Sequence, residues 1–448
     1  MAVGDKAAGG VEAARRGMGR NIVVQIVSLA MPPLLALVTA PVLAHGLGVT
    51  GRGEVAAGTA TLLFLSAVLT FGLQESVTHH VARYPGSERT LLIQSATVIA
   101  GLGVLGGIGT WFMAPWLADG NPELTVIIRL TAALVAPTLV RLVPRAIASG
   151  RHQWGLVAWE SWLTAIARAV TLVLLWLTGH LTVLSAALTI ALVPMLCGLV
   201  YLPLTIRVLR TPSAPSAETP SQRAVLGFGL KIWLGSLSGI ILTRVDQVLM
   251  VPLSNEAELG LYAVAASIGE VPTVVSTAVR NVVFAADSAE SDPQTQAKRL
   301  QQASRLAVAG SALAAFALGA TMHWWIPPLF GPGFADAWTA AVILLLATVV
   351  GTSGSVAGAG LGARGRPGLR SISMAVGACV NLLIFLVTVG TWGVIGAALS
   401  TLAGAFVSGS MNIVWLRRVF GIPARGFYGI RSEDVRLIRS MLTRLFRR

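Results

Sequence analysis

The sequence predicts an all-α integral membrane protein with about 12 transmembrane helices, arranged as two six-helix lobes around a central cavity. Composition is the first reason: 54% of the 448 residues are hydrophobic, 12% are charged and the mean hydropathy is +0.75. A soluble domain needs a more polar surface. The net charge of +14 comes from cations scattered in short loops, and a nucleic-acid binder would instead present one basic face. We expect no nucleic-acid partner.

The second reason is the length of the apolar runs. A helix crosses the hydrocarbon core with roughly 20 residues, and twelve runs are long enough to do so. They cover residues 22–44, 55–78, 90–114, 123–147, 155–178, 181–206, 224–252, 257–285, 302–325, 335–361, 369–390 and 393–416. The first run exceeds a signal-peptide core of roughly 7 to 15 residues, so we expect it to remain as a helix. Long blocks of Leu, Val, Ala and Gly also argue against the short alternating strands of a β-barrel.

The third reason is the distribution of Lys and Arg, which gather in alternate loops. The rich side holds the N-terminal arm, the loops near residues 83–89, 141–151, 207–231, 280–305 and 364–370, and the tail. By the positive-inside rule this side is cytoplasmic. We therefore expect a multi-pass protein of the cytoplasmic membrane with both termini inside.

The stretch RTPSAPSAETPSQR divides the runs six and six, because its Pro and Ser residues favour a linker. We predict a cytoplasmic N-terminal arm (1–21), an N-terminal six-helix lobe (22–206), a cytoplasmic linker (207–223), a C-terminal six-helix lobe (224–416) and a basic amphipathic cytoplasmic tail (417–448). A weak internal sequence similarity, between GEVAAGTA from residue 53 and GLYAVAAS from residue 260, favours a parallel repeat with a cavity where the lobes meet.

The tail places Val435, Ile438, Leu442 and Leu445 at helical intervals between arginines. This pattern is typical of a helix that lies on a membrane surface and is attracted to anionic lipids. The alternative is a basic end that only improves solubility.

Five ionisable residues fall deep inside predicted spans: Arg129, Arg168, Arg244, Asp246 and Glu270. Ionisable groups at such depth cost several kcal/mol when they face lipid, so we expect them to face a cavity. Three arginines outnumber two acids, and excess guanidinium suits phosphate, which it binds bidentately. The structural alternative is an ion pair that fastens the bundle, for example Arg168 with Glu270.

A second charged group lies near the cytoplasmic helix ends and contains Glu75, Arg141, Arg145, Glu160 and Arg280. We interpret Glu75, Arg141, Glu160 and Arg280 as a cytoplasmic gate of ion pairs or snorkelling side chains. Direct contact with a substrate is the alternative.

Motifs for catalysis or metal binding are missing from the sequence. It contains no GxxxxGKS, HExxH or GxSxG, which argues against an enzyme and against a metal or other cofactor. Cys197 and Cys379 lie far apart inside apolar runs, so we interpret them as small core residues. The glycines of GLGVLGGIG and GTSGSVAGAGLGARG indicate close helix packing. Interruptions of helices are predicted at Pro32, Pro33, Pro41, Pro137, Pro144 and Pro272.

Several segments carry a resemblance to a known family. They are PVLAHGLGVTGRGEVAAG, FGLQESVTHHVAR, LTRVDQVLMVPLSNEAELGLYAVAASIGEVP, PLFGPGFADAW, GARGRPGLR and GVIGAALSTLAG. Together they look like the polysaccharide exporters and oligosaccharide flippases of the multidrug/oligosaccharidyl-lipid/polysaccharide (MOP) superfamily. The resemblance implies a V-shaped pair of lobes around a cationic cavity and alternating access.

The resemblance also implies a function. It is transport of an undecaprenyl-(di)phosphate-linked oligosaccharide to the outer leaflet of the bacterial cytoplasmic membrane for cell-surface polysaccharide synthesis. Arg244, Arg129 and Arg168 would bind the phosphate, Asp246 or Glu270 would couple transport to Na⁺ or H⁺, and glycosyltransferases or a polymerase would be partners. The first predicted helix has no arginine, unlike lipid II flippases, which favours a capsule, teichoic-acid-like or exopolysaccharide unit. The alternatives are a drug/cation antiporter and a non-transporting envelope scaffold.

Overall fold

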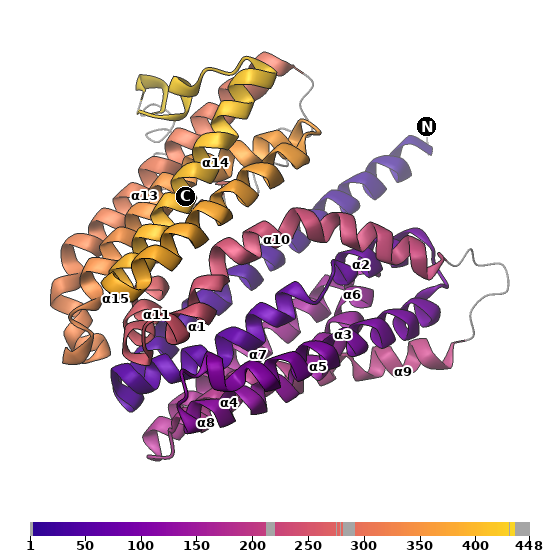
Figure 1. Ribbon diagram of the computed structural model, residues 1–448. Coiled ribbons are helices and arrows are strands. Elements are labelled where there is room, and N and C mark those ends of the chain that lie inside the picture. Colours follow the sequence, from indigo (N-terminus) through magenta and orange to yellow (C-terminus); the bar gives the residue numbers. More distant parts are fainter. Residues whose placement is uncertain are drawn as a thin grey trace. The chain divides into compact units, whose positions relative to one another are not determined.

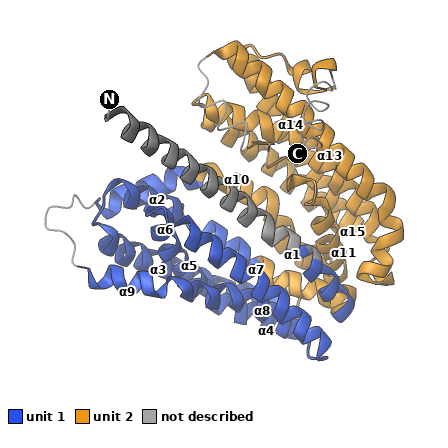
Figure 2. Ribbon diagram, turned by 180° about the vertical axis from the view of Figure 1, so that it is seen from behind, with its two compact units in different colours: residues 1–46, 61–115, 122–233 blue, residues 47–60, 116–121, 234–448 orange. Residues whose placement is uncertain are grey.

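A computed structural model describes residues 3–211, 220–274, 276–277, 279–280, 292–429 and 431–434, with side chains from residue 35 onward except Leu37. Every regular element in these ranges is helical (Figure 1). The chain forms two compact units (Figure 2). Unit 1 contains residues 1–46, 61–115 and 122–233, and unit 2 contains residues 47–60, 116–121 and 234–448.

The helices before the linker are mainly those of unit 1. They are α1 (Val3–Val68), α2 (Leu73–Arg83), α3 (Glu88–Leu117), α4 (Pro122–Ala133), α5 (Val135–Val140), α6 (Leu142–Gly150), α7 (Trp154–Leu177), α8 (Val183–Cys197), η1 (Gly198–Tyr201) and α9 (Leu202–Arg210). Gly48 interrupts α1 with a φ of 69°, a left-handed conformation that glycine adopts without a steric penalty.

The remaining helices belong to unit 2, except for the first part of α10, which lies in unit 1. They are α10 (Gln222–Leu253), α11 (Glu256–Gly269), α13 (Pro293–Phe330), η2 (Pro332–Phe334), α14 (Ala337–Ala363), α15 (Pro367–Phe420) and η3 (Ala424–Phe427).

Eight helices within the described ranges are long and apolar enough to cross a membrane, or nine if the bent pair Val38–Val68 and Leu73–Arg83 forms one span. This confirms an all-α membrane protein. Two predicted spans, 369–390 and 393–416, are merged in α15 across Gly393, whose φ is 49°. Part of the predicted span 257–285 lies outside the described residues, so the total of twelve stays a prediction.

Prolines explain why the span over Pro122–Gly150 is divided into three helices. A proline has no N–H to donate to the carbonyl four residues earlier, which is Ala133 for Pro137 and Val140 for Pro144. The helix is interrupted at Leu134 and at Arg141, directly after those two carbonyls. The interruptions predicted at Pro137 and Pro144 are therefore confirmed, and the one at Arg141 places a charged residue at a break. Those predicted at Pro32, Pro33 and Pro41 are wrong, because α1 continues through all three prolines.

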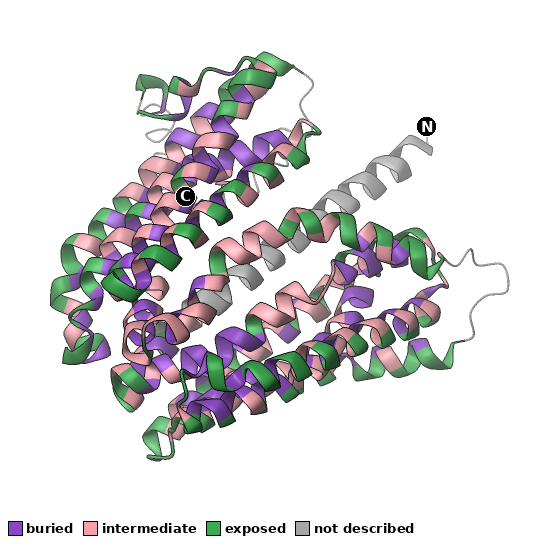
Figure 3. Cartoon of the chain, viewed as in Figure 1, coloured by how far each residue is buried: buried purple, intermediate pink, exposed green. Residues whose placement is uncertain are grey.

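Each unit has a core of its own, and its outer helix faces remain apolar. Leu73, Leu139 and Tyr201 are buried in unit 1, and Leu300, Val356 and Phe427 are buried in unit 2. Exposed side chains include Phe112 (78%), Phe316 (74%) and Val387 (76%), and exposed and buried residues alternate along the long helices (Figure 3). Large exposed apolar surfaces of this kind indicate contact with lipid.

The two cysteines differ in burial. Cys197 is buried and Cys379 is exposed, so the interpretation of both as core residues is wrong for Cys379. Its neighbours Ala378 and Asn381 are buried, so Cys379 lies on the outer face of α15.

Glycines allow close helix approaches, as predicted. A Cβ atom added to Gly354 of α14 would lie 2.0 Å from the Cα atom of Gly409 in α15. The two similar segments that begin at Gly53 and Gly260 also approach closely within unit 2. A Cβ atom on Gly53 would lie 1.7 Å from the carbonyl oxygen of Glu256, and one on Gly260 would lie 2.1 Å from the carbonyl oxygen of Val49. When the two segments are aligned, Gly53 corresponds to Gly260 and Val49 corresponds to Glu256. Each glycine therefore contacts the residue that corresponds to the other glycine's partner, and the contact is reciprocal. Equivalent residues touch in this way across a two-fold axis, which supports an internal repeat.

The first part of the predicted tail packs on unit 2. Arg305 of α13 donates from Nε to Oδ2 of Asp434 at 2.6 Å, from Nη2 to Oδ1 at 2.8 Å, and from Nη1 to the Gly426 carbonyl at 3.0 Å. Both side chains of the ion pair are almost fully buried, at 4% and 1% exposure. Val435, Ile438, Leu442 and Leu445 lie outside the described residues, so the membrane-surface helix stays a prediction.

Candidate functional site

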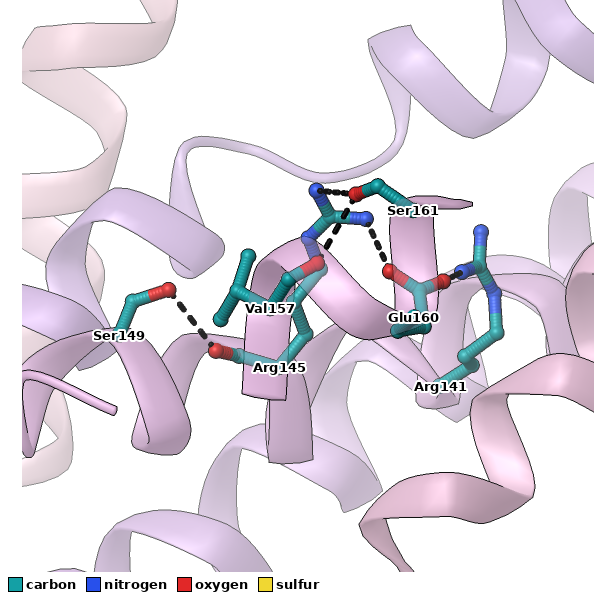
Figure 4. Close-up of polar contacts among 6 residues, drawn as sticks. All are labelled: Arg141, Arg145, Ser149, Val157, Glu160 and Ser161. Carbon is teal, nitrogen blue, oxygen red and sulfur yellow. Dashed lines mark hydrogen bonds and ion pairs between the residues drawn. The ribbon is translucent and has the colours of Figure 1, made fainter. Parts of the chain in front are cut away.

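A buried ion-pair triad occupies unit 1, where the break between α5 and α6 meets α7 (Figure 4). Arg141 donates from Nη1 to Oε1 of Glu160, and Arg145 donates from Nη1 to Oε2, both at 2.7 Å. Arg145 also donates to Ser161 Oγ at 3.3 Å. The Glu160 side chain is 1% exposed, against 15% for Arg141 and 28% for Arg145. The structure therefore brings together two of the four predicted gate residues, Arg141 and Glu160.

The triad carries one excess positive charge, because two guanidinium groups share one carboxylate. Each carboxylate oxygen accepts a charge-assisted hydrogen bond, which offsets the cost of taking the charges out of water. Arg141 fits because η1 begins with glycine: a Cβ atom on Gly198 would lie 2.5 Å from Cδ of Arg141. The Nε atom of Arg141 is buried without a hydrogen-bond partner in the described part of the chain.

A buried carboxylate of unit 2 has neutral partners instead. Asp246 of α10 is 3% exposed and accepts hydrogen bonds from the Tyr262 hydroxyl and from the Gln247 backbone N–H. The Tyr262 oxygen lies 3.2 Å from Oγ1 of Thr401 in α15. We call Asp246, Tyr262 and Thr401 the Asp246 cluster.

A buried amide lies close to the Asp246 cluster. Asn381 is fully buried, and neither polar atom of its side chain has a hydrogen-bond partner among the described residues. A Cβ atom on Gly404 would lie 2.8 Å from both Cβ of Asn381 and Cδ1 of Leu242. Leu242 is about one helical turn from Asp246, and Gly404 is about one turn from Thr401. An unpaired buried amide is costly, so this position calls for a functional explanation.

The other predicted substrate and coupling residues have different surroundings. Arg129 of α4 lies over the ring of Trp111, 5.3 Å from its centroid. Arg168 of α7 and Arg244 of α10 are partly buried, and neither forms an ion pair within the described ranges. Arg244 attracts Asp246 electrostatically without a direct bond. Glu270 is exposed just after the end of α11.

The two remaining gate residues do not join the triad. Glu75 is exposed on α2 in unit 1. Arg280 belongs to unit 2, where its charge acts repulsively on Arg370. The grouping of Glu75 and Arg280 in one gate stays a prediction, as does the pairing of Arg168 with Glu270.

Comparisons with known proteins identify the family. The model of a family described as polysaccharide biosynthesis protein matches residues 18–284, which is more than half of the chain. The chain belongs to this polysaccharide biosynthesis family. A comparison with curated proteins gave no match.

The fold of this polysaccharide biosynthesis protein is that of the MOP superfamily. An inward-facing multidrug resistance MATE family transporter of the MOP superfamily is 17% identical, with 89% of this chain and 98% of that chain covered and a TM-score of 0.67. The lipid II flippase MurJ in an inward closed conformation is 13% identical, with coverages of 91% and 89% and a TM-score of 0.70. A MOP superfamily transporter from Pyrococcus furiosus, described as having a binding pocket of reverse polarity, is 16% identical, with coverages of 89% and 94% and a TM-score of 0.54.

Three residues of the site in this family member were missed by sequence reasoning. Tyr262 lies in the GLYAVAAS segment, but nothing in its spacing shows that it faces Asp246. Thr401 and Asn381 are single polar residues in apolar runs. An asparagine in a membrane helix is a detectable signal, because its amide needs partners, whereas a threonine can bond its own helix, as Thr401 does with Ala397.

Proposed function

We propose that this polysaccharide biosynthesis protein is a flippase. It moves an undecaprenyl-(di)phosphate-linked oligosaccharide from the inner to the outer leaflet of the bacterial cytoplasmic membrane by alternating access, for cell-surface polysaccharide synthesis. The observation that carries this proposal is the pair of membrane-embedded arginines that have no ion-pair partner among the described residues, Arg168 and Arg244, in a member of this family. Guanidinium groups in a poorly solvated setting bind phosphate oxygens strongly. Arg129, the third predicted phosphate ligand, lies over the ring of Trp111.

The ion-pair triad gives the proposed cycle a gate. Glu160 holds Arg141 at a proline-induced break, where the backbone can change direction at low cost. Opening exchanges the contacts that Arg141 and Arg145 make with Glu160 for contacts of the two guanidinium groups with water or with a phosphate group. The excess positive charge of the triad favours an anionic cargo over a cationic one.

The Asp246 cluster is the proposed coupling site for Na⁺ or H⁺. Its partners are hydroxyl and backbone groups, so a proton or a sodium ion can bind the carboxylate without breaking an ion pair. Asn381 supplies an unpaired carbonyl oxygen nearby, and hard cations prefer oxygen ligands. Glu270, the other predicted coupling residue, has an exposed position in which an ion is more weakly held.

A drug/cation antiporter is the rival function, since a MATE family transporter shares the fold. Cationic drugs need acidic partners, whereas Arg168 and Arg244 repel them. A non-transporting scaffold that recruits glycosyltransferases or a polymerase through the tail is the second rival. A chain ending at Asp434 tests the scaffold, because it keeps the Arg305–Asp434 ion pair and removes the basic residues that follow. Retained function in this truncated chain contradicts the scaffold.

The deciding experiment is depletion of the protein in its host, followed by leaflet-resolved analysis of polyprenyl-linked saccharides. We expect one lipid-linked saccharide to accumulate on the cytoplasmic face, and its chemistry then identifies the cargo. Arg244→Ala and Arg168→Ala should fail to restore its transport. Arg417→Ala, at an exposed position in the last turn of α15, is the matched control and should restore it. Absence of any accumulated lipid-linked saccharide would overturn the proposal in favour of the antiporter.

A further inference from the structure

A surface groove lies in unit 1 where α3 packs against α4 and α5. Its volume is about 400 Å³, within the range of roughly 300 to 1,000 Å³ that small-molecule sites occupy. The helices approach closely at its floor: a Cβ atom on Gly103 would lie 2.6 Å from Cα of Ala136, and one on Gly107 would lie 2.8 Å from the carbonyl oxygen of Ala132. The groove exists because these floor residues have little or no side chain. We call it the unit 1 groove.

The walls of the unit 1 groove are large apolar side chains on the exposed face of α3. Trp111 is 45% exposed and Phe112 is 78% exposed, as expected for side chains in contact with lipid. Trp111 is about 9 Å from the end of α3 and Gly103 is about 21 Å from it. The groove therefore extends over roughly the depth of one leaflet, since the hydrocarbon core is about 30 Å thick.

A cation lies at the end of the unit 1 groove that contains Trp111, which is the end nearer to the last residue of α3. The Arg129 guanidinium is 5.3 Å from the centroid of Trp111, within the distance of a cation–π contact. Arg129 is about one helical turn before Ala132 and Ala133, so the three residues share a face of α4. Its Nε atom is buried and has no hydrogen-bond partner among the described residues. A guanidinium in an apolar setting needs an anionic or polar partner, and no acidic residue lines the groove.

We propose that the unit 1 groove binds one anionic phospholipid of the bilayer. Arg129 donates to the lipid phosphate, Trp111 holds the guanidinium plane, and an acyl chain lies along the glycine and alanine floor. One guanidinium matches a single phosphate, whereas the diphosphate of the proposed cargo carries more charge. A second copy of the chain is a poorer occupant, because its apolar α3 face would leave Arg129 without an anion.

Unit 2 contains a groove that serves as an internal control. It has a volume of about 350 Å³, lies between α13 and α14, and is lined by apolar residues that include Phe316, Gly319, Ala320 and Val342. The residue about one turn before Val342 on the same helix face is Thr339, not a cation. On the other wall, His323 follows Ala320 by about one turn of α13. This unit 2 groove therefore has room for an acyl chain but has no guanidinium at the positions that correspond to Arg129.

The test is native mass spectrometry of the full chain in detergent, titrated with phosphatidylglycerol or with zwitterionic phosphatidylcholine. Both lipids carry a phosphate, but the choline cation of phosphatidylcholine is repelled by the Arg129 guanidinium. We therefore expect the wild type to retain one phosphatidylglycerol about tenfold more tightly than phosphatidylcholine. Arg129→Gln should abolish this preference, and Arg129→Lys should keep part of it. Ala133→Leu, which fills the unit 1 groove, should reduce retention of both lipids. Ala320→Leu, the matched change in the unit 2 groove, should leave the preference unchanged.

Three results would overturn the proposal. Unchanged phosphatidylglycerol retention in Arg129→Gln would show that the phosphate binds elsewhere. Tighter binding of undecaprenyl phosphate than of phosphatidylglycerol, lost in the same variant, would assign the groove to the cargo. Wild-type dimers that Ala133→Leu dissociates would assign it to a second copy. Elution of each variant as a single species and an unchanged melting midpoint confirm folding, and no transport assay is needed, so the outcome is independent of the flippase proposal.

Discussion

Glu160 in unit 1 and Asp246 in unit 2 are both buried acids on membrane helices, but their partners differ. Glu160 has a guanidinium on each oxygen, while Asp246 has a tyrosine hydroxyl and a backbone N–H. An ion pair in a poorly solvated setting depends on both charges being present. A carboxyl group among neutral donors can change its charge and keep most of its hydrogen bonds. The comparison indicates that unit 1 uses its acid to hold two cations together in the state with the proposed gate closed, and that unit 2 can use its acid as a switch.

The largest expected effect is that of Glu160→Gln on stability. This change keeps the shape of the side chain but leaves Arg141 and Arg145 with no negative partner, and breaking a buried pair in this way costs about 3 kcal/mol or more. We expect a clearly lower melting midpoint of the purified protein. Ser161→Ala is the control and should change little, because it removes the 3.3 Å contact of Arg145 and a bond of Ser161 Oγ to the Val157 carbonyl of its own helix but leaves both ion pairs intact. Equal midpoints for Glu160→Gln and the wild type would refute a structural role for the triad.

A smaller effect is expected from Gly198→Val, which tests whether the position of Arg141 matters. The added side chain would overlap with the aliphatic part of Arg141, since a Cβ atom alone would lie 2.5 Å from its Cδ. Overpacking of this kind typically costs about 1 to 3 kcal/mol. We expect a melting midpoint between those of the wild type and Glu160→Gln. In a background of Arg141→Ala, Gly198→Val should lower the melting midpoint by much less than it does in the wild type. An equal drop in both backgrounds would show that the added side chain clashes with a residue other than Arg141.

Asp246→Asn should change stability by only about 1 kcal/mol, because its amide oxygen still accepts the Tyr262 hydrogen bond. Its effect should be on coupling instead: transport of the lipid-linked cargo should lose its dependence on a Na⁺ or H⁺ gradient. Transport into proteoliposomes with and without each gradient measures this. Glu270→Gln, at the exposed position, is the control and should retain the dependence. If Asp246→Asn destabilises the protein as strongly as Glu160→Gln does, the contrast between the two units fails.

The parts of this fold that could be predicted are those governed by local chemistry. Long apolar runs indicated membrane helices, and Pro137 and Pro144 indicated where one of them is interrupted, because a missing N–H acts on the same helix. The pairing of Arg141 with Glu160 was also within reach, since both residues lie near the same end of neighbouring spans. These signals need no knowledge of how distant segments pack.

Other parts depend on contacts between distant segments. Tyr262 meets Thr401 across 139 residues, and helical periodicity does not specify which faces of α11 and α15 meet. The contact of Arg129 with Trp111 was not predicted for a related reason: depth along a helix is readable from the sequence, but the direction that a side chain faces is not. Arg129 and Arg168 are both predicted to lie at membrane depth, and the structure adds that Arg129 lies over Trp111 beside the unit 1 groove.

Asp434 extends the comparison to a third buried acid, one that lies outside the membrane helices and can be titrated without a change in sequence. Hydrogen bonds from Arg305 are the main cause that holds the pKa of Asp434 below its ordinary value of 3.8. Because the folded-state pKa is the lower one, this ion pair stabilises the protein fully above the unfolded value, and the stabilisation is lost as pH falls through the folded-state pKa. We expect the melting midpoint of Asp434→Asn to lie below that of the wild type at pH 6. The two midpoints should begin to converge below about pH 3.8 and should meet once the pH is below the folded-state pKa. A difference that persists unchanged into that acidic range would show that Asp434 acts through packing of residues 421–434, not through its charge.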